Sequence, residues 1–377
     1  MRVIFACAGT GGHINPAIAI AKMIQKHQRS EILFIGTKNG LENQLVKNAD
    51  FEIKHIRTGK LIRSFTLKNI KAVIDAYRGI GDAKKIIQEF KPDLVIGTGG
   101  YICGPVMLAA KELKIPYILH ESNAFPGVSV KLLAKSAKYV MLGFEDAKNR
   151  LKRKDNLVYT GTPAKFNELD FAKLNQMDCR KKLGLAHISK KMILVTCGSQ
   201  GAKRVNEAIV ELLQENLSED YYIILVTGQY SYEEIKSKLE KIQKEKKIDL
   251  SKYIRVEKFI YQMDEMYKAV DMCITRAGAM TITELALTRK PAILIPLPTA
   301  AENHQYYNAK VLENFGAGKI LEQKDLTAKL LDETIKEMLQ ADHLEQMEQA
   351  MNQHIEQIVP KEVENKIYKC IENVVQK

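Results

Sequence analysis

Short, mostly apolar runs recur along the chain, and the segments between them carry apolar residues at helical spacing. Residues 3–8 form the first run, and Asn15 and Pro16 are then expected to open the first helix. Further runs lie at residues 32–35, 94–96, 117–119, 139–142, 157–159, 192–196, 221–226, 254–256, 259–260, 273–275, 292–295 and 319–321. Strands buried on both faces and separated by helices are typical of parallel sheets, so the pattern predicts the α/β class.

Glycine-rich turns follow several of these runs. Residues 9–13 read Gly-Thr-Gly-Gly-His, residues 97–100 read Gly-Thr-Gly-Gly, and residues 197–202 restart the pattern. Glycines let the backbone approach a ligand, and amides at a helix N-terminus bind anions. We therefore expect two Rossmann-like domains, residues 1–162 and 163–355, whose loops face a cleft. The last helix, within residues 356–377, is expected to pack back on the first domain.

Polar side chains cluster where a strand at residues 273–275 passes through a glycine turn into a helix beginning at about Ala279. Thr281, Thr283 and Glu284 lie in the first turns of this helix, where amides and the helix dipole favour phosphate and a carboxylate can accept from ribose hydroxyls. After the next strand, residues 302–305 supply groups suited to sugar hydroxyls. The stretch therefore indicates a nucleotide-sugar site. A plainer interpretation also fits, in which Glu284 complements the dipole and the threonines cap the helix.

Two further polar positions are candidates for proton transfer. His13 ends the first glycine turn, where an imidazole can take a proton from a hydroxyl or only donate a hydrogen bond to phosphate. The turn at residues 120–127 begins with His120 and Glu121, which either face a ligand or form a local pair at the end of a strand. Both interpretations stay open at this point.

Net charge and cysteine spacing limit the classes of binding partner and the cellular compartment that we expect for the protein. The chain has 57 basic and 45 acidic residues, a net charge of +12, which favours an anionic partner such as nucleic acid, a phosphorylated substrate or a membrane surface. Its six cysteines are scattered without a CxxC pair, as expected for reduced thiols in the cytoplasm. We expect neither a signal peptide nor a membrane span, because no run of about 18 apolar residues occurs.

The segment from residue 59 to residue 85 is basic and amphipathic. Its apolar positions 70, 73, 74 and 77 follow helical spacing, which predicts a helix packed on the sheet. A second interpretation places Leu61, Ile62 and Phe65, just before the helix, at an anionic membrane surface.

Four motifs, in a characteristic order, resemble the MurG family of bacterial glycosyltransferases over essentially the whole chain. They are AGTGGHINPA, HESNAFPG, CGSQGA and RAGAMTITE followed by residues 302–308. The sequence departs from the family pattern at Ala8, Ser122, Cys197 and Lys165, where the family usually has Gly, Gln, Gly and Arg. At position 165, lysine keeps the charge and loses the bidentate fork of arginine.

This resemblance implies a GT-B glycosyltransferase at the cytoplasmic face of the bacterial membrane, attached peripherally. The expected reaction inverts the anomeric centre as N-acetylglucosamine passes from UDP-N-acetylglucosamine to undecaprenyl-linked muramyl-pentapeptide. Amides and a helix N-terminus can stabilise the leaving UDP, so we expect no cofactor and no metal.

The resemblance also implies roles for individual residues. His13 is the expected base, with Glu121 as the next candidate. The implied substrate-binding residues are Thr10, Gly11, Gly12, Asn123, Lys165, Ser199, Ile260 through its backbone, Ala279, Met280, Thr281, Ile282, Thr283, Glu284, His304 and Gln305.

Two other classes of protein share parts of this pattern. A different UDP-sugar enzyme of the same architecture, such as a glycolipid glycosyltransferase or an epimerase, would share the donor site but not the acceptor. A nucleic-acid-binding protein would explain the positive charge and leave the glycine turns and Glu284 without a purpose. We therefore expect no nucleic-acid partner.

Overall fold

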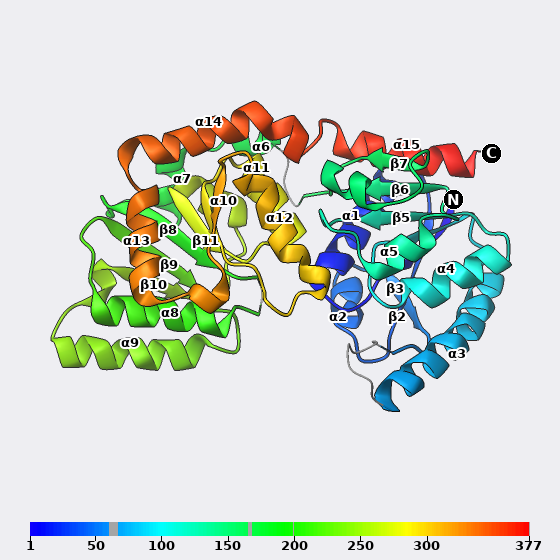
Figure 1. Ribbon diagram of the computed structural model, residues 1–377, viewed down its shortest axis with the longest axis horizontal. Helices are drawn as coiled ribbons and strands as arrows, with labels where there is room; N and C mark the ends of the chain where they lie inside the picture. The colour runs from blue at the N-terminus through cyan, green and yellow to red at the C-terminus, as the bar shows by residue number, and fades with distance from the viewer. Residues whose placement is uncertain (60–66, 165–167, 199, 377) are drawn as a thin grey trace. The chain divides into compact units, whose positions relative to one another are not determined.

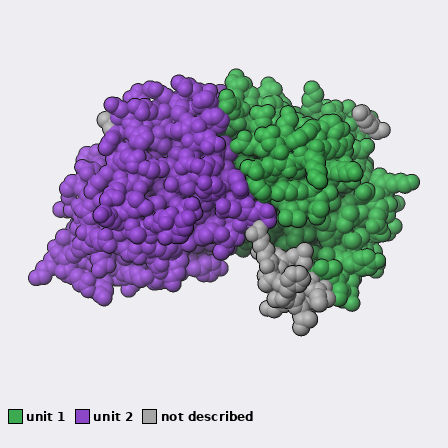
Figure 2. All heavy atoms as spheres, viewed as in Figure 1, with its two compact units in different colours: residues 1–165, 356–377 green, residues 166–355 purple. Residues whose placement is uncertain are grey.

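A computed structural model describes residues 1–59, 67–164, 168–198 and 200–376. The chain divides into two compact units (Figure 2). Unit 1 comprises residues 1–165 together with 356–377, and unit 2 comprises residues 166–355. Each unit is built on one parallel sheet, so the predicted α/β class is confirmed.

Unit 1 is organised on a sheet of seven parallel strands in the order β3-β2-β1-β4-β5-β6-β7. The strands are β1 (Arg2–Ala6), β2 (Glu31–Gly36), β3 (Glu52–His55), β4 (Leu94–Gly97), β5 (Tyr117–Glu121), β6 (Tyr139–Leu142) and β7 (Leu157–Tyr159). The chain adds β2 and β3 on one side of β1 and then returns to place β4 on the other side. The carboxyl ends of β1 and β4 therefore flank the switch point at which open α/β sheets bind ligands.

Helices cover both faces of this sheet (Figure 1). They are α1 (Gly11–His27), α2 (Glu42–Lys47), α3 (Leu67–Phe90), α4 (Cys103–Glu112), α5 (Val128–Leu133) and α15 (Val363–Val375), with a 3₁₀ turn η1 at Glu145–Arg150. One core joins α1 and α15 to the face of β1 that carries Val3 and Phe5. The other joins α3, α4 and α5 to the face that carries Ile4 and Ala6. Successive side chains of β1 thus point alternately into the two cores.

The first helix begins earlier than the sequence suggested. Thr10 is the N-cap of α1, and the amides of His13 and Ile14 already bond to the Thr10 carbonyl oxygen. Pro16 therefore lies inside the helix and does not open it. Most of the first glycine turn is consequently the first turn of the helix, which brings its amides to the switch point.

The prediction that residues 73, 74 and 77 of α3 pack on the sheet is wrong. Val73, Ile74 and Tyr77 have exposed fractions of 58%, 47% and 79%. The buried stripe of α3 instead runs through Ala72, Gly79, Ala83, Ile86 and Ile87. A Cβ at position 79 would lie 2.1 Å from the carbonyl oxygen of Arg57, so small residues allow a close backbone approach there. This packing turns the larger apolar side chains outward.

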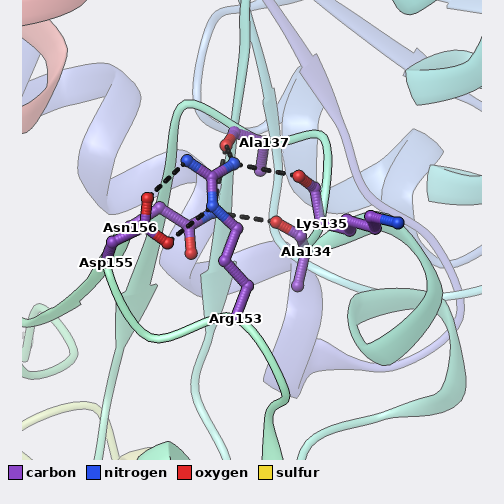
Figure 3. A network of polar contacts seen from close by, with 6 residues as sticks. All are labelled: Ala134, Lys135, Ala137, Arg153, Asp155 and Asn156. Carbon is purple, nitrogen blue, oxygen red and sulfur yellow. Dashed lines mark hydrogen bonds and ion pairs between the residues drawn. The ribbon is translucent and has the colours of Figure 1, made fainter.

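The segment between α5 and β7 is fixed by a polar network (Figure 3). Arg153 holds the Asp155 carboxylate with both Nε and an Nη atom and donates to the carbonyl oxygen of Lys135 at 2.9 Å. Asn156 donates to the carbonyl oxygens of Ala134 and Ala137 at 2.8 and 3.0 Å. Carbonyls at the C-cap of α5 and just beyond it, which the helix cannot satisfy, thereby gain donors.

Unit 2 repeats the architecture with six parallel strands in the order β10-β9-β8-β11-β12-β13. They are β8 (Lys191–Thr196), β9 (Tyr221–Val226), β10 (Ile254–Glu257), β11 (Met272–Thr275), β12 (Ala292–Leu294) and β13 (Gly318–Ile320). Residues 259 and 260 lie beyond β10, so the expectation that they extend the sheet is wrong. The switch point of this sheet lies between β8 and β11.

The helices of unit 2 are α6 (Glu168–Ala172), α7 (Gln176–Lys182), α8 (Lys203–Glu215), α9 (Tyr232–Lys246), α10 (Met263–Ala269), α11 (Ala279–Leu287), α12 (His304–Glu313) and α13 (Ala328–Met338). Short 3₁₀ turns lie at η2 (Leu250–Lys252), η3 (Ala301–Asn303) and η4 (Gln323–Asp325), and α14 (Ala341–Ile358) contains the boundary between the units. Asn175 and Thr327 cap α7 and α13 with their side chains. By contrast, the N-cap of α11 is Gly278, which has no side chain to bond its amides.

Candidate active site

His13 and Thr98 join the two glycine turns at the switch point of unit 1. The Thr98 hydroxyl donates to the carbonyl oxygen of His13 at 2.7 Å, and His13 Nδ1 lies 3.2 Å from the carbonyl oxygen of Thr98. A Cβ at Gly99, whose φ is +115°, would lie 2.3 Å from His13 Nδ1. The two turns therefore lie side by side, and Gly99 leaves the space that the imidazole occupies.

This contact determines which ring nitrogen of His13 can accept a proton. A carbonyl oxygen only accepts hydrogen bonds, so Nδ1 carries the hydrogen that points to Thr98. In the neutral ring, the lone pair is then on Nε2. The side chain is half-buried, and Thr10 and Gly12 beside it are exposed. Such a histidine has the tautomer that a general base needs.

Glu42 is a buried acid beside the first turn that sequence reasoning missed. Its Oε1 accepts from the Thr37 amide at 2.9 Å and from the Thr37 hydroxyl at 2.7 Å, and its Oε2 lies 3.4 Å from the Gly9 amide. The side chain is fully buried. Its only signal in the sequence is an acid a few residues after β2, and its contacts suit it to hold the turn, not to meet a ligand.

The carboxylate of Glu121 holds the turn that follows β5. Oε1 accepts from the amide and the side chain of Asn123 at 3.0 and 2.9 Å, and Oε2 accepts from the Gly127 amide at 2.8 Å. Burial raises the pKa of Glu121, whereas these donors lower it. Both oxygens are thus engaged within the turn, and Oε1 orients the side-chain amide of Asn123.

His120 does not form the local pair with Glu121 that was one interpretation of the sequence. Its Nε2 donates to the carbonyl oxygen of Gly161 at 3.2 Å, and its Nδ1 accepts from the Ser122 hydroxyl at 3.3 Å. Burial lowers the pKa of His120 to about 4. His120 is therefore a neutral link between the turn after β5 and the segment after β7.

The N-terminus of α11 lies at the switch point of unit 2. The amides of residues 279–281 have no acceptor within the helix, whereas the Ile282 amide bonds to the Gly278 carbonyl oxygen. Met280, Thr281 and Glu284 share the partly exposed face. The side chains of Ala279, Ile282 and Thr283 are buried, and the Thr283 hydroxyl donates to the Ala279 carbonyl oxygen at 3.1 Å. The predicted helix start is confirmed, and only half of the six side chains face outward.

Beside α11, the loop after β12 is held in a defined shape. Arg276 donates to the carbonyl oxygens of Ile295 and Pro296 at 3.1 and 3.2 Å, and Gln305 accepts from the Leu297 amide at 3.0 Å. His304 Nδ1 donates to the Ala301 carbonyl oxygen at 2.7 Å, and burial lowers the pKa of His304.

Within this loop, Glu302 and Asn303 both have φ of +53°. Consecutive non-glycine residues in the left-handed region cost about 1–3 kcal/mol each, and such strain clusters at functional sites.

The remaining predicted donor residues differ in what the structure says of them. Ile260 is buried, whereas its sequence neighbours Phe259 and Tyr261 are exposed. The rings of these two neighbours contact each other edge to face, with their centroids 4.8 Å apart. Lys165 and Ser199 lie outside the described residues, as do Leu61, Ile62 and Phe65.

In the part of the chain that the structure describes, no three His, Cys, Asp or Glu side chains gather as a metal site requires. Among the described helices, none is both long and apolar enough to cross a bilayer.

Comparison with known proteins matches both units to one family. Residues 3–142 match the N-terminal domain of glycosyltransferase family 28, and residues 192–363 match its C-terminal domain. Two α/β units, each built on a parallel sheet and matched to these domains, define a glycosyltransferase of GT-B architecture.

Full-length relatives narrow this class. A UDP-N-acetylglucosamine--N-acetylmuramyl-(pentapeptide) pyrophosphoryl-undecaprenol N-acetylglucosamine transferase from Thermoanaerobacter sp. (strain X514) is 40% identical, covering 99% of this chain and all of the relative. The transferase of the same name from Acetivibrio thermocellus is 40% identical over 90% of this chain and 89% of its own. The crystal structure of Acinetobacter baumannii MurG matches with a TM-score of 0.76 at 29% identity, covering 98% of this chain and 99% of that one. The chain belongs to the MurG family.

Proposed function

We propose that the chain transfers N-acetylglucosamine from UDP-N-acetylglucosamine to the muramyl sugar of undecaprenyl-pyrophosphoryl-muramyl-pentapeptide. The product is the complete lipid-linked disaccharide precursor of peptidoglycan. The relatives are named for this reaction, and their sequences match this chain over 89% or more of their length. The observation that carries the proposal is the donor-side arrangement in unit 2, where Glu284 lies one turn beyond helix amides that have no acceptor within α11.

The donor end of the proposal follows from this arrangement. The amides at the start of α11 and the dipole of the helix favour the diphosphate, and the partly exposed Glu284 carboxylate can accept from the ribose hydroxyls. His304 and Gln305 begin α12 next to the strained loop, and we assign them to the sugar hydroxyls. We assign the uracil to the Ile260 backbone. Ser199 and Lys165 remain assigned to the donor by resemblance alone.

The acceptor end of the proposal rests on unit 1. Thr10, Gly11 and Gly12 begin α1 and suit the lipid pyrophosphate, for the same reasons of amide geometry. The acceptor hydroxyl attacks the anomeric carbon from the face opposite UDP, and we assign removal of its proton to Nε2 of His13. The bonds that hold Glu121 within its turn favour a positioning role for it, through the orientation of Asn123 toward the donor sugar.

The acceptor is a membrane lipid, so we propose that unit 1 binds the cytoplasmic face of the membrane peripherally. Support comes from the outward stripe of α3, Val73, Ile74 and Tyr77, together with the exposed Arg78 and Lys85 on the same helix. Apolar side chains flanked by basic ones are suited to an anionic bilayer surface.

The decisive experiment measures UDP release by the purified chain. With UDP-N-acetylglucosamine and lipid-linked muramyl-pentapeptide together, UDP should appear in equal amount to the disaccharide-lipid product. Leaving out the acceptor, or supplying UDP-glucose instead, should reduce release to background. Equal release with a diacylglycerol acceptor, or conversion of the donor to its epimer without acceptor, would contradict the proposal.

A further inference from the structure

A buried tyrosine contacts the carboxylate assigned to the donor ribose. Tyr267 lies on α10 and is only 1% exposed, yet its hydroxyl reaches Oε2 of Glu284 at 3.3 Å. A buried phenol needs a hydrogen-bond partner, and a core position filled only for packing would suit phenylalanine. Here the hydroxyl connects the interior of unit 2 to the partly exposed face of α11.

The direction of this hydrogen bond is fixed. Burial, and next the charge of Glu284, raise the pKa of Tyr267 well above its ordinary value. The phenol therefore keeps its proton and donates to the carboxylate. A donor on one oxygen restricts rotation of the Glu284 side chain, and a restricted acceptor loses less entropy when a ligand hydroxyl binds to it.

We propose that Tyr267 is a positioning residue that holds the Glu284 carboxylate in the orientation in which it accepts from the ribose hydroxyls of the nucleotide. This inference rests on the proposed function, because it assumes that Glu284 binds the ribose. It predicts that Tyr267 contributes to recognition of the 2′-hydroxyl without touching the nucleotide.

The test compares UDP with 2′-deoxy-UDP by calorimetric titration of the full chain. The wild type should prefer UDP by about tenfold, as expected for a hydrogen bond to a charged group. Tyr267→Phe removes one hydroxyl and leaves the ring. It should weaken UDP binding about fivefold and leave 2′-deoxy-UDP binding within about twofold, so that the preference nearly disappears.

Tyr221→Phe is the matched control. Tyr221 is also a buried tyrosine of unit 2, and its hydroxyl donates to the Asp332 carboxylate at 2.7 Å. Its substitution should lower thermal stability by a similar amount and leave the preference for UDP unchanged. A change of preference in both variants would mean that any loss of a buried hydroxyl disturbs the site, which would overturn the proposal.

Glu284→Gln separates this proposal from the proposed function. If Glu284→Gln abolishes the preference and Tyr267→Phe preserves it, Glu284 binds the ribose and Tyr267 does not position it. If Glu284→Gln itself leaves UDP binding unchanged, the assignment of the donor site fails, and the role of Tyr267 fails with it. If the proposal holds, adding Tyr267→Phe to Glu284→Gln should change the preference no further.

Discussion

His13 and Thr98 are bound to each other by two contacts, hydroxyl to carbonyl oxygen at 2.7 Å and imidazole to carbonyl oxygen at 3.2 Å. They belong to the turns after β1 and β4, which are neighbours in the sheet. At the switch point of unit 1, the imidazole ring of His13 is therefore held in one orientation, with its Nδ1 hydrogen directed to the carbonyl oxygen of Thr98.

His13→Gln should lower turnover about 10²–10⁴-fold, the usual contribution of a general base. Glutamine can still donate to Thr98 but cannot accept the proton of the acceptor hydroxyl. The wild-type rate should fall on the acid side as the imidazole becomes protonated, and that limb should be absent in the variant. Steady-state rates across pH test both points. A variant with full turnover and only a raised Michaelis constant for the acceptor would make His13 a binding group.

Gly99→Ala should destabilise unit 1 by about 2 kcal/mol or more, because the φ of +115° disfavours a side chain and the new Cβ would strike the His13 ring. Gly81→Ala is the control, since position 81 lies within α3 with open space around its Cβ. That change should stabilise by about 0.5–1 kcal/mol. Thermal unfolding of both variants provides the comparison. Equal melting temperatures would mean that the turn at Gly99 adapts freely.

Replacing Val73, Ile74 and Tyr77 by Ser should weaken binding to vesicles of anionic phospholipid. Binding of the wild type to these vesicles should weaken as salt is added, because each basic residue near the anionic surface contributes about 1 kcal/mol of electrostatic attraction, which salt screens. Flotation assays measure both effects. The control changes Leu169 and Met177, which are exposed apolar residues of unit 2, to Ser. If the two sets of substitutions behave alike, the stripe on α3 has no special role at the membrane.

His120 should make unit 1 less stable in mild acid. Its pKa is about 4 when folded against an ordinary value of 6.5, so the unfolded chain takes up the proton first. Its contribution is complete above pH 6.5 and is lost as the pH falls towards 4, by about 3 kcal/mol in total. His120→Gln keeps a donor for Gly161 and should flatten this part of the stability profile. Urea unfolding at pH 7 and pH 5 measures the difference, and parallel profiles would rule the effect out.

Most strands of both units, and the turns after them, could be predicted from sequence. Parallel strands are buried on both faces, so each reads as an apolar run that can be recognised without knowing which strand pairs with it. The edge strand β3 was missed, since Glu52–His55 is short and Ile53 is its one apolar residue. The orientation of α3 was also misjudged. Ala72, Gly79 and Ala83 add little hydrophobicity, and only the close approach of the Arg57 backbone shows that they form the packed stripe.

The candidate site was predicted to the level of loops and not of individual side chains. Glu284 and His13 are candidates from the sequence because they stand near glycine turns at helix starts. Nothing in the sequence indicates that Thr283 turns its hydroxyl back to Ala279, because that depends on which face of the helix is buried. Tyr267 carried no signal either, since its contact with Glu284 joins two helices separated by a strand.

Helix α15 has a consequence for how the protein is made. Ile367, Cys370 and Ile371 belong to the same core as Val3 and Phe5, although more than 350 residues separate the ends of the chain. During translation, every residue of unit 2 leaves the ribosome before α15 does. The second unit in the sequence can therefore finish folding first, while the apolar surface of α1 that α15 covers waits in an unfinished first unit. Ribosomes that stop before residue 363 would release chains with that surface open to aggregation.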